Sequence, residues 1–190
     1  MVFSIQQQDK GFSPVRAGGA RIVDPSDEFE IAGAYGTDIF SGQPVYMFTD
    51  GKLNVLNATD DRIQGVFNGC WYVDTQGDTI FRPYWPASTA IQTGSVVKAS
   101  VYDAAGFFQI GADADTLQAD IENFADITPT TGTGGSTVTG RSSVKVDYSQ
   151  LDVGITTESV VRIFERSQQP GEVRLLIVKF ARPGFAGDLA

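Results

Sequence analysis

Residues 44–56 carry the clearest folding signal in the chain, because two short β-prone runs flank the pair Asp50-Gly51. The runs cover residues 44–49 and 52–56 and are rich in Val, Tyr, Phe and Leu. Asp-Gly tolerates the positive φ angles that a two-residue hairpin turn requires. The pattern therefore predicts an antiparallel hairpin that turns tightly at Asp50-Gly51.

A second hairpin is predicted over residues 63–82, with its turn at residues 74–77. It belongs to an aromatic stretch, residues 65–88, that holds two Trp, two Tyr, two Phe and a single Cys. Neighbouring residues of a strand face opposite sides, so Trp71 and Tyr72 cannot both point into one core. One face is expected to be core and the other an interface.

Tyr84-Trp85 lies between Pro83 and Pro86, which cannot donate hydrogen bonds to a sheet. This pair is therefore expected at a strand end or a sheet edge. Three roles for the two rings stay open: a corner of the core, an anchor between subunits, or a platform for a sugar.

Further β-rich runs cover residues 96–102, 107–110, 144–148, 159–166 and 173–181, the last of them apolar enough to be buried on both faces over part of its length. Short strands separated by turn signals favour a sandwich or a barrel. Residues 113–124 predict a helix, because Leu117, Ile121 and Phe124 follow a helical spacing, or else a loop with one turn. Residues 128–140, rich in Gly and Thr, predict a flexible loop tip or an extended surface segment.

We predict that residues 1–30 form an extended arm, because Gly and Pro interrupt them and their apolar residues follow no helical spacing. Such a segment has no core of its own, so its apolar side chains must lie on the domain or on a neighbouring chain. The predicted fold is all-β: a single β-barrel or β-sandwich domain over residues 31–190, with the arm before it and at most one short helix.

Composition narrows the classes of function. The chain has 190 residues, of which 42% are hydrophobic, and 14 Lys and Arg stand against 23 Asp and Glu, giving a net charge of −9. An acidic chain without a basic face is not expected to bind nucleic acid. Neither a membrane span nor a signal peptide is predicted, which favours synthesis in a cytoplasm.

Catalysis is not expected either. The chain has no histidine, which removes the His-dependent triads and most zinc sites. Cys70, the single cysteine, stands in an apolar setting typical of an inert buried thiol. The local carboxylate pairs, Asp60-Asp61 and Asp113 with Asp115, lack the pattern of a calcium loop. We therefore predict no enzyme, no cofactor and no metal.

Five short motifs, in this order, resemble a group of small virion proteins of tailed bacteriophages, many of them from marine and cyanobacterial phages. The motifs are YGTDIFSGQPV at residues 35–45, IQGVFNGCWYVD at 63–74, YWP at 84–86, VYD at 101–103 and FQIGAD at 108–113. Proteins of this group are usually regarded as head decoration, or cement, proteins. The likeness covers roughly residues 31–180, and none of its motifs is a catalytic signature.

The resemblance implies a non-enzymatic protein of the capsid exterior, made in the bacterial cytoplasm, that binds the major capsid protein and stabilises the shell, often as a homotrimer. In that role the arm contacts the capsid and another surface meets copies of the protein. The aromatic density and the flanking prolines make Tyr84 and Trp85 the candidates for this subunit contact. The candidate capsid contacts are Phe3, Phe12, Val15, Arg16, Arg21 and Ile22. Two other functions stay open: a structural protein of the tail or baseplate, and a carbohydrate-binding module displayed on the virion.

Overall fold

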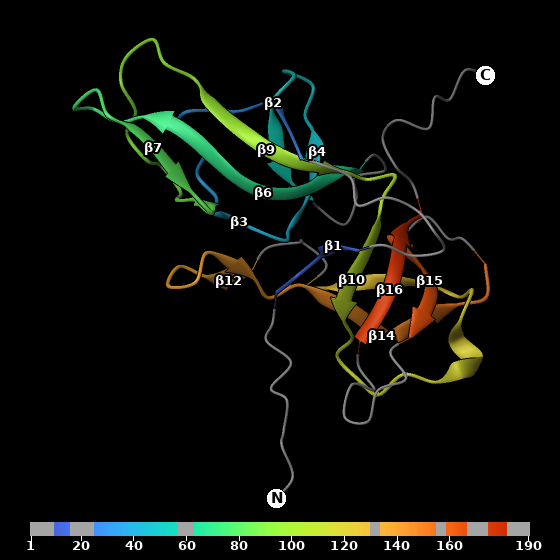
Figure 1. Ribbon diagram of the computed structural model, residues 1–190. Coiled ribbons are helices and arrows are strands. Elements are labelled where there is room, and N and C mark those ends of the chain that lie inside the picture. Colours follow the sequence, from blue (N-terminus) through green and yellow to red (C-terminus); the bar gives the residue numbers. More distant parts are fainter. Residues whose placement is uncertain are drawn as a thin grey trace, which may run out of the picture.

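The computed structural model describes residues 10–15, 25–56, 63–129, 134–154, 159–166 and 175–181. This part of the chain is almost entirely β, as predicted, and its strands pair antiparallel in two large sheets. Figure 1 shows sheet I in the upper half of the molecule and sheet II in the lower half.

Sheet I runs in the order β2-β9-β6-β4-β5, and β7 pairs with β6 beside this path. Its strands are β2 (Ser26–Ile31), β9 (Val97–Asp103), β6 (Ile63–Val73), β4 (Pro44–Met47), β5 (Leu53–Val55) and β7 (Thr79–Arg82). Sheet II runs in the order β1-β10-β16-β15-β11-β14. Its strands are β1 (Ser13–Val15), β10 (Phe107–Gly111), β16 (Leu175–Phe180), β15 (Val161–Arg166), β11 (Phe124–Thr128) and β14 (Lys145–Asp152).

Both predicted hairpins are confirmed, one with a different turn. β4 and β5 pair as expected, but Phe48 and Lys52 still share a backbone hydrogen bond of 2.8 Å, so three residues form the loop. Gly51 closes it with a φ of 78°, the left-handed position that such a three-residue loop needs. In the second hairpin, Asp74 Oδ1 accepts hydrogen bonds from the backbone N–H groups of Gln76 and Asp78.

Sheet II curves until its far strand returns to β10. Ala112, directly after β10, forms a parallel bridge with Val146 of β14, and the Asp113 N–H donates to the Val146 carbonyl at 3.1 Å. The earlier part of the same β10 edge pairs with β1, where Val15 lies opposite Phe107. Unpaired strand edges invite association with other chains. β1, from the predicted arm, therefore covers the portion of the edge that β14 does not.

The buried side chains form two clusters rather than one core. Cluster I lies in sheet I and contains Phe67, Cys70, Tyr72 and Trp85 from the aromatic stretch. Cluster II lies mainly on sheet II, where residues such as Phe108 and Ile110 of β10 alternate, and it also includes Ile63 and Val66 of β6 in sheet I. β16 also alternates between buried and half-buried residues, so the prediction that part of it is buried on both faces is wrong.

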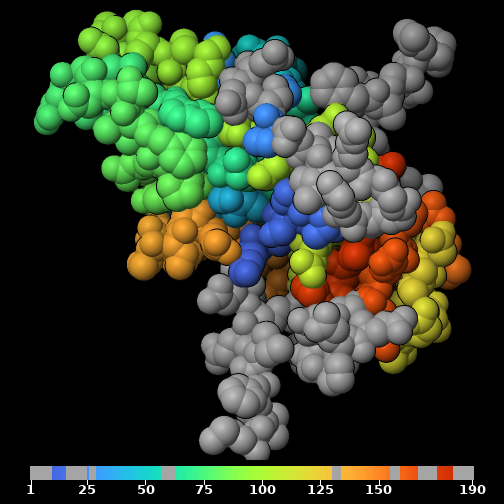
Figure 2. Space-filling view, in the orientation of Figure 1, coloured from blue at the N-terminus to red at the C-terminus, as the bar shows by residue number. Residues whose placement is uncertain are grey.

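A two-stranded hairpin lies between β11 and β14 of sheet II in the sequence and contacts the segment that leads into β4 of sheet I. We call it the connecting hairpin. It consists of β12 (Gly135–Ser136) and β13 (Arg141–Ser142), in the Gly/Thr-rich segment. Gln43, whose side chain is fully buried, accepts a hydrogen bond from the Phe40 N–H and donates Nε2 to the Gly134 carbonyl. Figure 2 shows the hairpin packed beneath the green atoms of the β7 and β8 region. Val138 at its tip is exposed, which agrees with the predicted surface segment.

Of the two alternatives predicted for residues 113–124, the helix is wrong and the loop with one turn is confirmed. One 3₁₀ turn, Gln118–Asp120, is present, and β11 begins at Phe124. Leu117, which was expected on the buried face of the helix, is 63% exposed. Its N–H donates to the Tyr148 hydroxyl at 2.6 Å, and this tertiary contact holds the segment as a loop with one turn.

Candidate binding surfaces

The predicted subunit anchor Trp85 is a core residue, so its side chain cannot contact another subunit. It is 0% exposed, its indole Nε1–H donates to the Tyr35 carbonyl at 3.2 Å, and its ring meets Tyr72 edge-on. As the flanking prolines predict, Trp85 lies in a short edge strand, β8 (Tyr84–Trp85), which pairs with β3 (Ile39–Phe40). Burial corrects the expected role, because the ladder lies over cluster I. Tyr84 is half-buried and stacks on Phe40 at 5.5 Å.

The candidate capsid contacts divide into three groups. Phe3, Arg16, Arg21 and Ile22 lie outside the described residues. Phe12 is 2% exposed and packs against Phe180 and Phe108 of its own chain, which corrects its expected role as a contact for the capsid. Val15 is half-buried on β1, at the margin of the outer face of sheet II.

The outer face of sheet II carries a row of basic and aromatic side chains. Directly paired residues of neighbouring strands share a face of the sheet. Val15 pairs with Phe107, Lys179 with Arg162, and Arg162 with Phe124. Lys179 Nζ lies 5.7 Å from the centre of the Phe107 ring, and this contact links the first pair to the other three residues. We call these five residues the cationic-aromatic row.

Contacts within the row and with two neighbouring side chains, Phe164 and Glu122, fix the side chains of the row. The Arg162 guanidinium lies 5.8 Å from the Phe124 ring centre and 5.2 Å from that of Phe164, and it forms a salt bridge with Glu122. Phe164 in turn meets Phe107 edge-on at 5.1 Å. Each such cation–π contact contributes about 0.5–1 kcal/mol when it is exposed to solvent. Together they hold half-buried rings and charges in place before any partner arrives.

This arrangement is chemically suited to binding a protein. Arg and aromatic residues are enriched at the centres of protein interfaces. Figure 2 shows atoms of β1 (blue), β10 (yellow-green), β16 (red) and β15 (orange) next to one another, in the order in which these strands pair in sheet II. The charge of Arg162 is compensated by Glu122, so Lys179 is the cation of the row that favours an acidic partner.

The sequence predicts the strands of this face but not the row itself. Arg162 and Phe164 stand two residues apart within an expected strand, which does indicate a shared face. Phe124, Phe107 and Lys179 come from strands distant in sequence. Only the strand order of sheet II brings them beside Arg162.

Sheet I also exposes aromatic side chains. Tyr72 points into cluster I, while Trp71 lies on the outer face against Phe81, with ring centres 4.8 Å apart. The prediction that Trp71 and Tyr72 face opposite sides is therefore confirmed. Phe81 is 50% exposed and its ring covers Gly69, where an added Cβ would lie 2.9 Å from it. Part of the apolar area of the Phe81 ring is thus buried against β6.

Cys70 is buried, as predicted, and burial raises the pKa of its thiol to about 12, against a smaller opposite effect of Arg82. Because folding favours the protonated thiol, this stabilisation is complete below the ordinary pKa of 9.0 and is lost as the pH rises toward 12. We expect iodoacetamide at about pH 8 to modify the folded protein very slowly and the urea-unfolded protein quickly. Mass spectrometry gives both rates, and equal rates would contradict the burial of the thiol.

Comparison of the chain with protein-family models, with curated proteins and with solved structures finds no match. Within the described residues, no helix has the length and apolar character needed to cross a membrane. The fold and the surfaces define an all-β protein with a pre-organised basic and aromatic face.

Proposed function

We propose that this protein is a non-enzymatic structural component of a phage virion, which binds the outside of the capsid as a homotrimer and cements neighbouring major capsid proteins. The cationic-aromatic row carries the proposal, because it offers a fixed surface for a protein partner. The resemblance of the five sequence motifs to decoration proteins supports the capsid as that partner.

The charges of the row indicate how the contact works. Lys179 meets an acidic group of the capsid, while Phe107, Phe124 and Val15 lose water-accessible apolar area. Apolar burial contributes about 25 cal/mol per Å² before the costs of association are subtracted. A trimer that engages three sites at once gains further affinity, because the second and third contacts are intramolecular.

Charge reversal in the row is expected to weaken capsid binding by about tenfold or more, since the new carboxylate would face acidic groups. The change is Lys179→Glu, a half-buried residue on the outer face of β16. Purified protein is mixed with DNA-free expanded capsids that lack it, and co-sedimentation gives the bound fraction. The temperature of capsid disruption is measured on the same samples, and bound wild-type protein is expected to raise it.

Arg141→Glu is the matched control, because it reverses an exposed charge on β13, away from the row. It should bind as the wild type does. Equal binding by Lys179→Glu and the wild type would remove the row from the contact. Failure of the wild type to bind any head form would overturn the capsid proposal, and binding to isolated tails would then assign the protein to the tail.

A further inference from the structure

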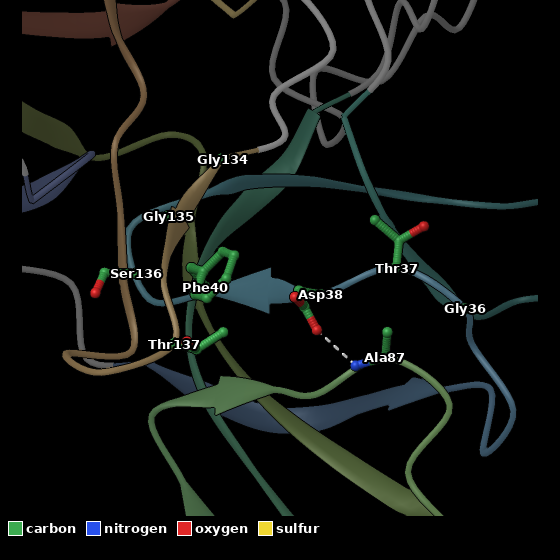
Figure 3. A pocket seen from close by; sticks show the side chains of 9 residues that line it. All are labelled: Gly36, Thr37, Asp38, Phe40, Ala87, Gly134, Gly135, Ser136 and Thr137. Atoms are coloured by element: carbon green, nitrogen blue, oxygen red, sulfur yellow. Dashed lines mark hydrogen bonds between the residues drawn. The ribbon is translucent and has the colours of Figure 1, made fainter.

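An open cleft of about 610 Å³ lies between the β3 region and the connecting hairpin. Its lining comes from three separate segments: Gly36, Thr37, Asp38 and Phe40; Ala87; and Gly134, Gly135, Ser136 and Thr137. Figure 3 shows Asp38 between Phe40 and Ala87, with Thr137 on the opposite side of the cleft. Neither the cationic-aromatic row nor any of its contacts contributes to this lining.

The walls of the cleft are fixed by contacts behind them. The Phe40 ring is enclosed between Tyr84, which stacks on one side, and Gly135, where an added Cβ would lie 2.4 Å from ring atoms. The Gly134 carbonyl accepts hydrogen bonds from Gln43 Nε2 at 3.3 Å and from the Ser143 N–H at 3.1 Å. A site held in this way orders few groups when a ligand binds, which favours affinity.

Asp38 is oriented in the same manner. Its Oδ1 accepts a hydrogen bond of 2.6 Å from the Ala87 backbone N–H, and this bond fixes the carboxylate plane. Figure 3 shows the second carboxylate oxygen turned away from that amide, toward the Phe40 side of the cleft. An ionised carboxylate accepts hydrogen bonds at both oxygens. One carboxylate oxygen thus binds the Ala87 backbone N–H, and the other faces the cleft.

The chemistry of the lining selects among ligands. Asp38 is the one charged side chain among the described lining residues, so an anion would be repelled. A wholly apolar ligand would remove water from this carboxylate without replacing its hydrogen bonds, which is costly. A polyhydroxylated ring can donate hydroxyl hydrogens to the second carboxylate oxygen and place C–H groups against Ala87, while Phe40, which is 5% exposed, adds little contact area. We propose that the cleft binds one neutral saccharide unit of a glycan.

The cleft is separate from Tyr84-Trp85, for which a platform for a sugar is one of the predicted roles. Trp85 is fully buried and Tyr84 stacks on Phe40, so this pair offers no open ring pair to a sugar. Saccharide binding at the cleft is independent of the proposed capsid contact. Lys179→Glu should leave it unchanged.

A titration of the full-length protein with methyl glycosides of glucose, mannose, galactose and N-acetylglucosamine tests the proposal. Backbone amide chemical shifts are followed by NMR, and at least one glycoside should saturate shifts at residues 36–38, 87 and 134–137. The dissociation constant is expected on the order of 1 mM, because one sugar ring offers few contact atoms. Asp38→Asn should weaken binding about tenfold, because the amide nitrogen cannot accept the sugar hydroxyl.

Asp50→Asn is the matched control, since Asp50 Oδ1 also accepts a backbone hydrogen bond, from Lys52, but in the β4–β5 loop. It should bind like the wild type. Absence of shifts at the cleft with every glycoside would overturn the proposal, as would equal binding by Asp38→Asn. Binding of a short uncharged Thr-Val peptide at these amides, without binding of any glycoside, would assign the cleft to a polypeptide instead.

Discussion

Replacing Trp85 with alanine is expected to lower the free energy of unfolding by about 3–5 kcal/mol, because the change opens a cavity in cluster I. The indole is fully buried, contacts Tyr72 and donates its N–H to Tyr35. The loss is large against the roughly 5–15 kcal/mol by which a folded domain is typically more stable than its unfolded chain. Urea unfolding followed by circular dichroism gives the value.

Trp71→Ala supplies the comparison, since Trp71 is half-buried on the outer face of the same sheet, against Phe81. Its loss should cost about 1–2 kcal/mol, in proportion to the smaller apolar area that it buries. Equal destabilisation by the two alanine variants would contradict the assignment of Trp85 to the core. An unchanged free energy of unfolding for Trp85→Ala would show that the indole is exposed.

Phe12→Ala is expected to cost a similar amount, about 3–5 kcal/mol. The ring packs against Phe180 at 4.9 Å and Phe108 at 6.1 Å, and the Phe12 N–H donates to the Gly42 carbonyl. Thermal and urea unfolding of the full-length variant measure the loss. A change below about 1 kcal/mol would show that this part of the predicted arm does not belong to cluster II.

Removal of residues 1–9 is the corresponding control, because it leaves Phe12 and β1 in place. The free energy of unfolding of this truncation is measured beside that of the full chain. If the two values agree, a loss of capsid binding by the truncated protein reports on contacts rather than on folding. A longer truncation through residue 25 would remove a core ring and uncover the β10 edge, so it would confuse the two effects.

The sequence predicts most strands because their signals are local. Turn residues such as Asp50-Gly51 and Asp74 mark both hairpins, and β-prone runs between them mark most of the longer strands of the two sheets. For residues 113–124 the loop with one turn is confirmed, and the helical alternative is wrong for the opposite reason. Its helical spacing is weak local information, and the Tyr148 hydroxyl, from a distant strand, decides its conformation.

The surfaces were less predictable than the strands. Prolines around Tyr84-Trp85 correctly indicate an edge ladder, but whether an edge residue is buried depends on what packs over it. The cleft and the cationic-aromatic row each combine segments far apart in the chain. Their composition follows from strand order and from the position of the connecting hairpin, and neither is encoded in a short motif.

The place of β10 between β1 and β16 has a consequence for synthesis on the ribosome. Every residue of cluster I lies between Ile31 and Val101, so a nascent chain contains all of sheet I well before it is finished. Sheet II needs β16, residues 175–180, before β10 gains its second neighbour. We therefore expect vectorial folding, in which sheet I is already packed while the hydrophobic strands of sheet II await their last partner and depend on protection from aggregation.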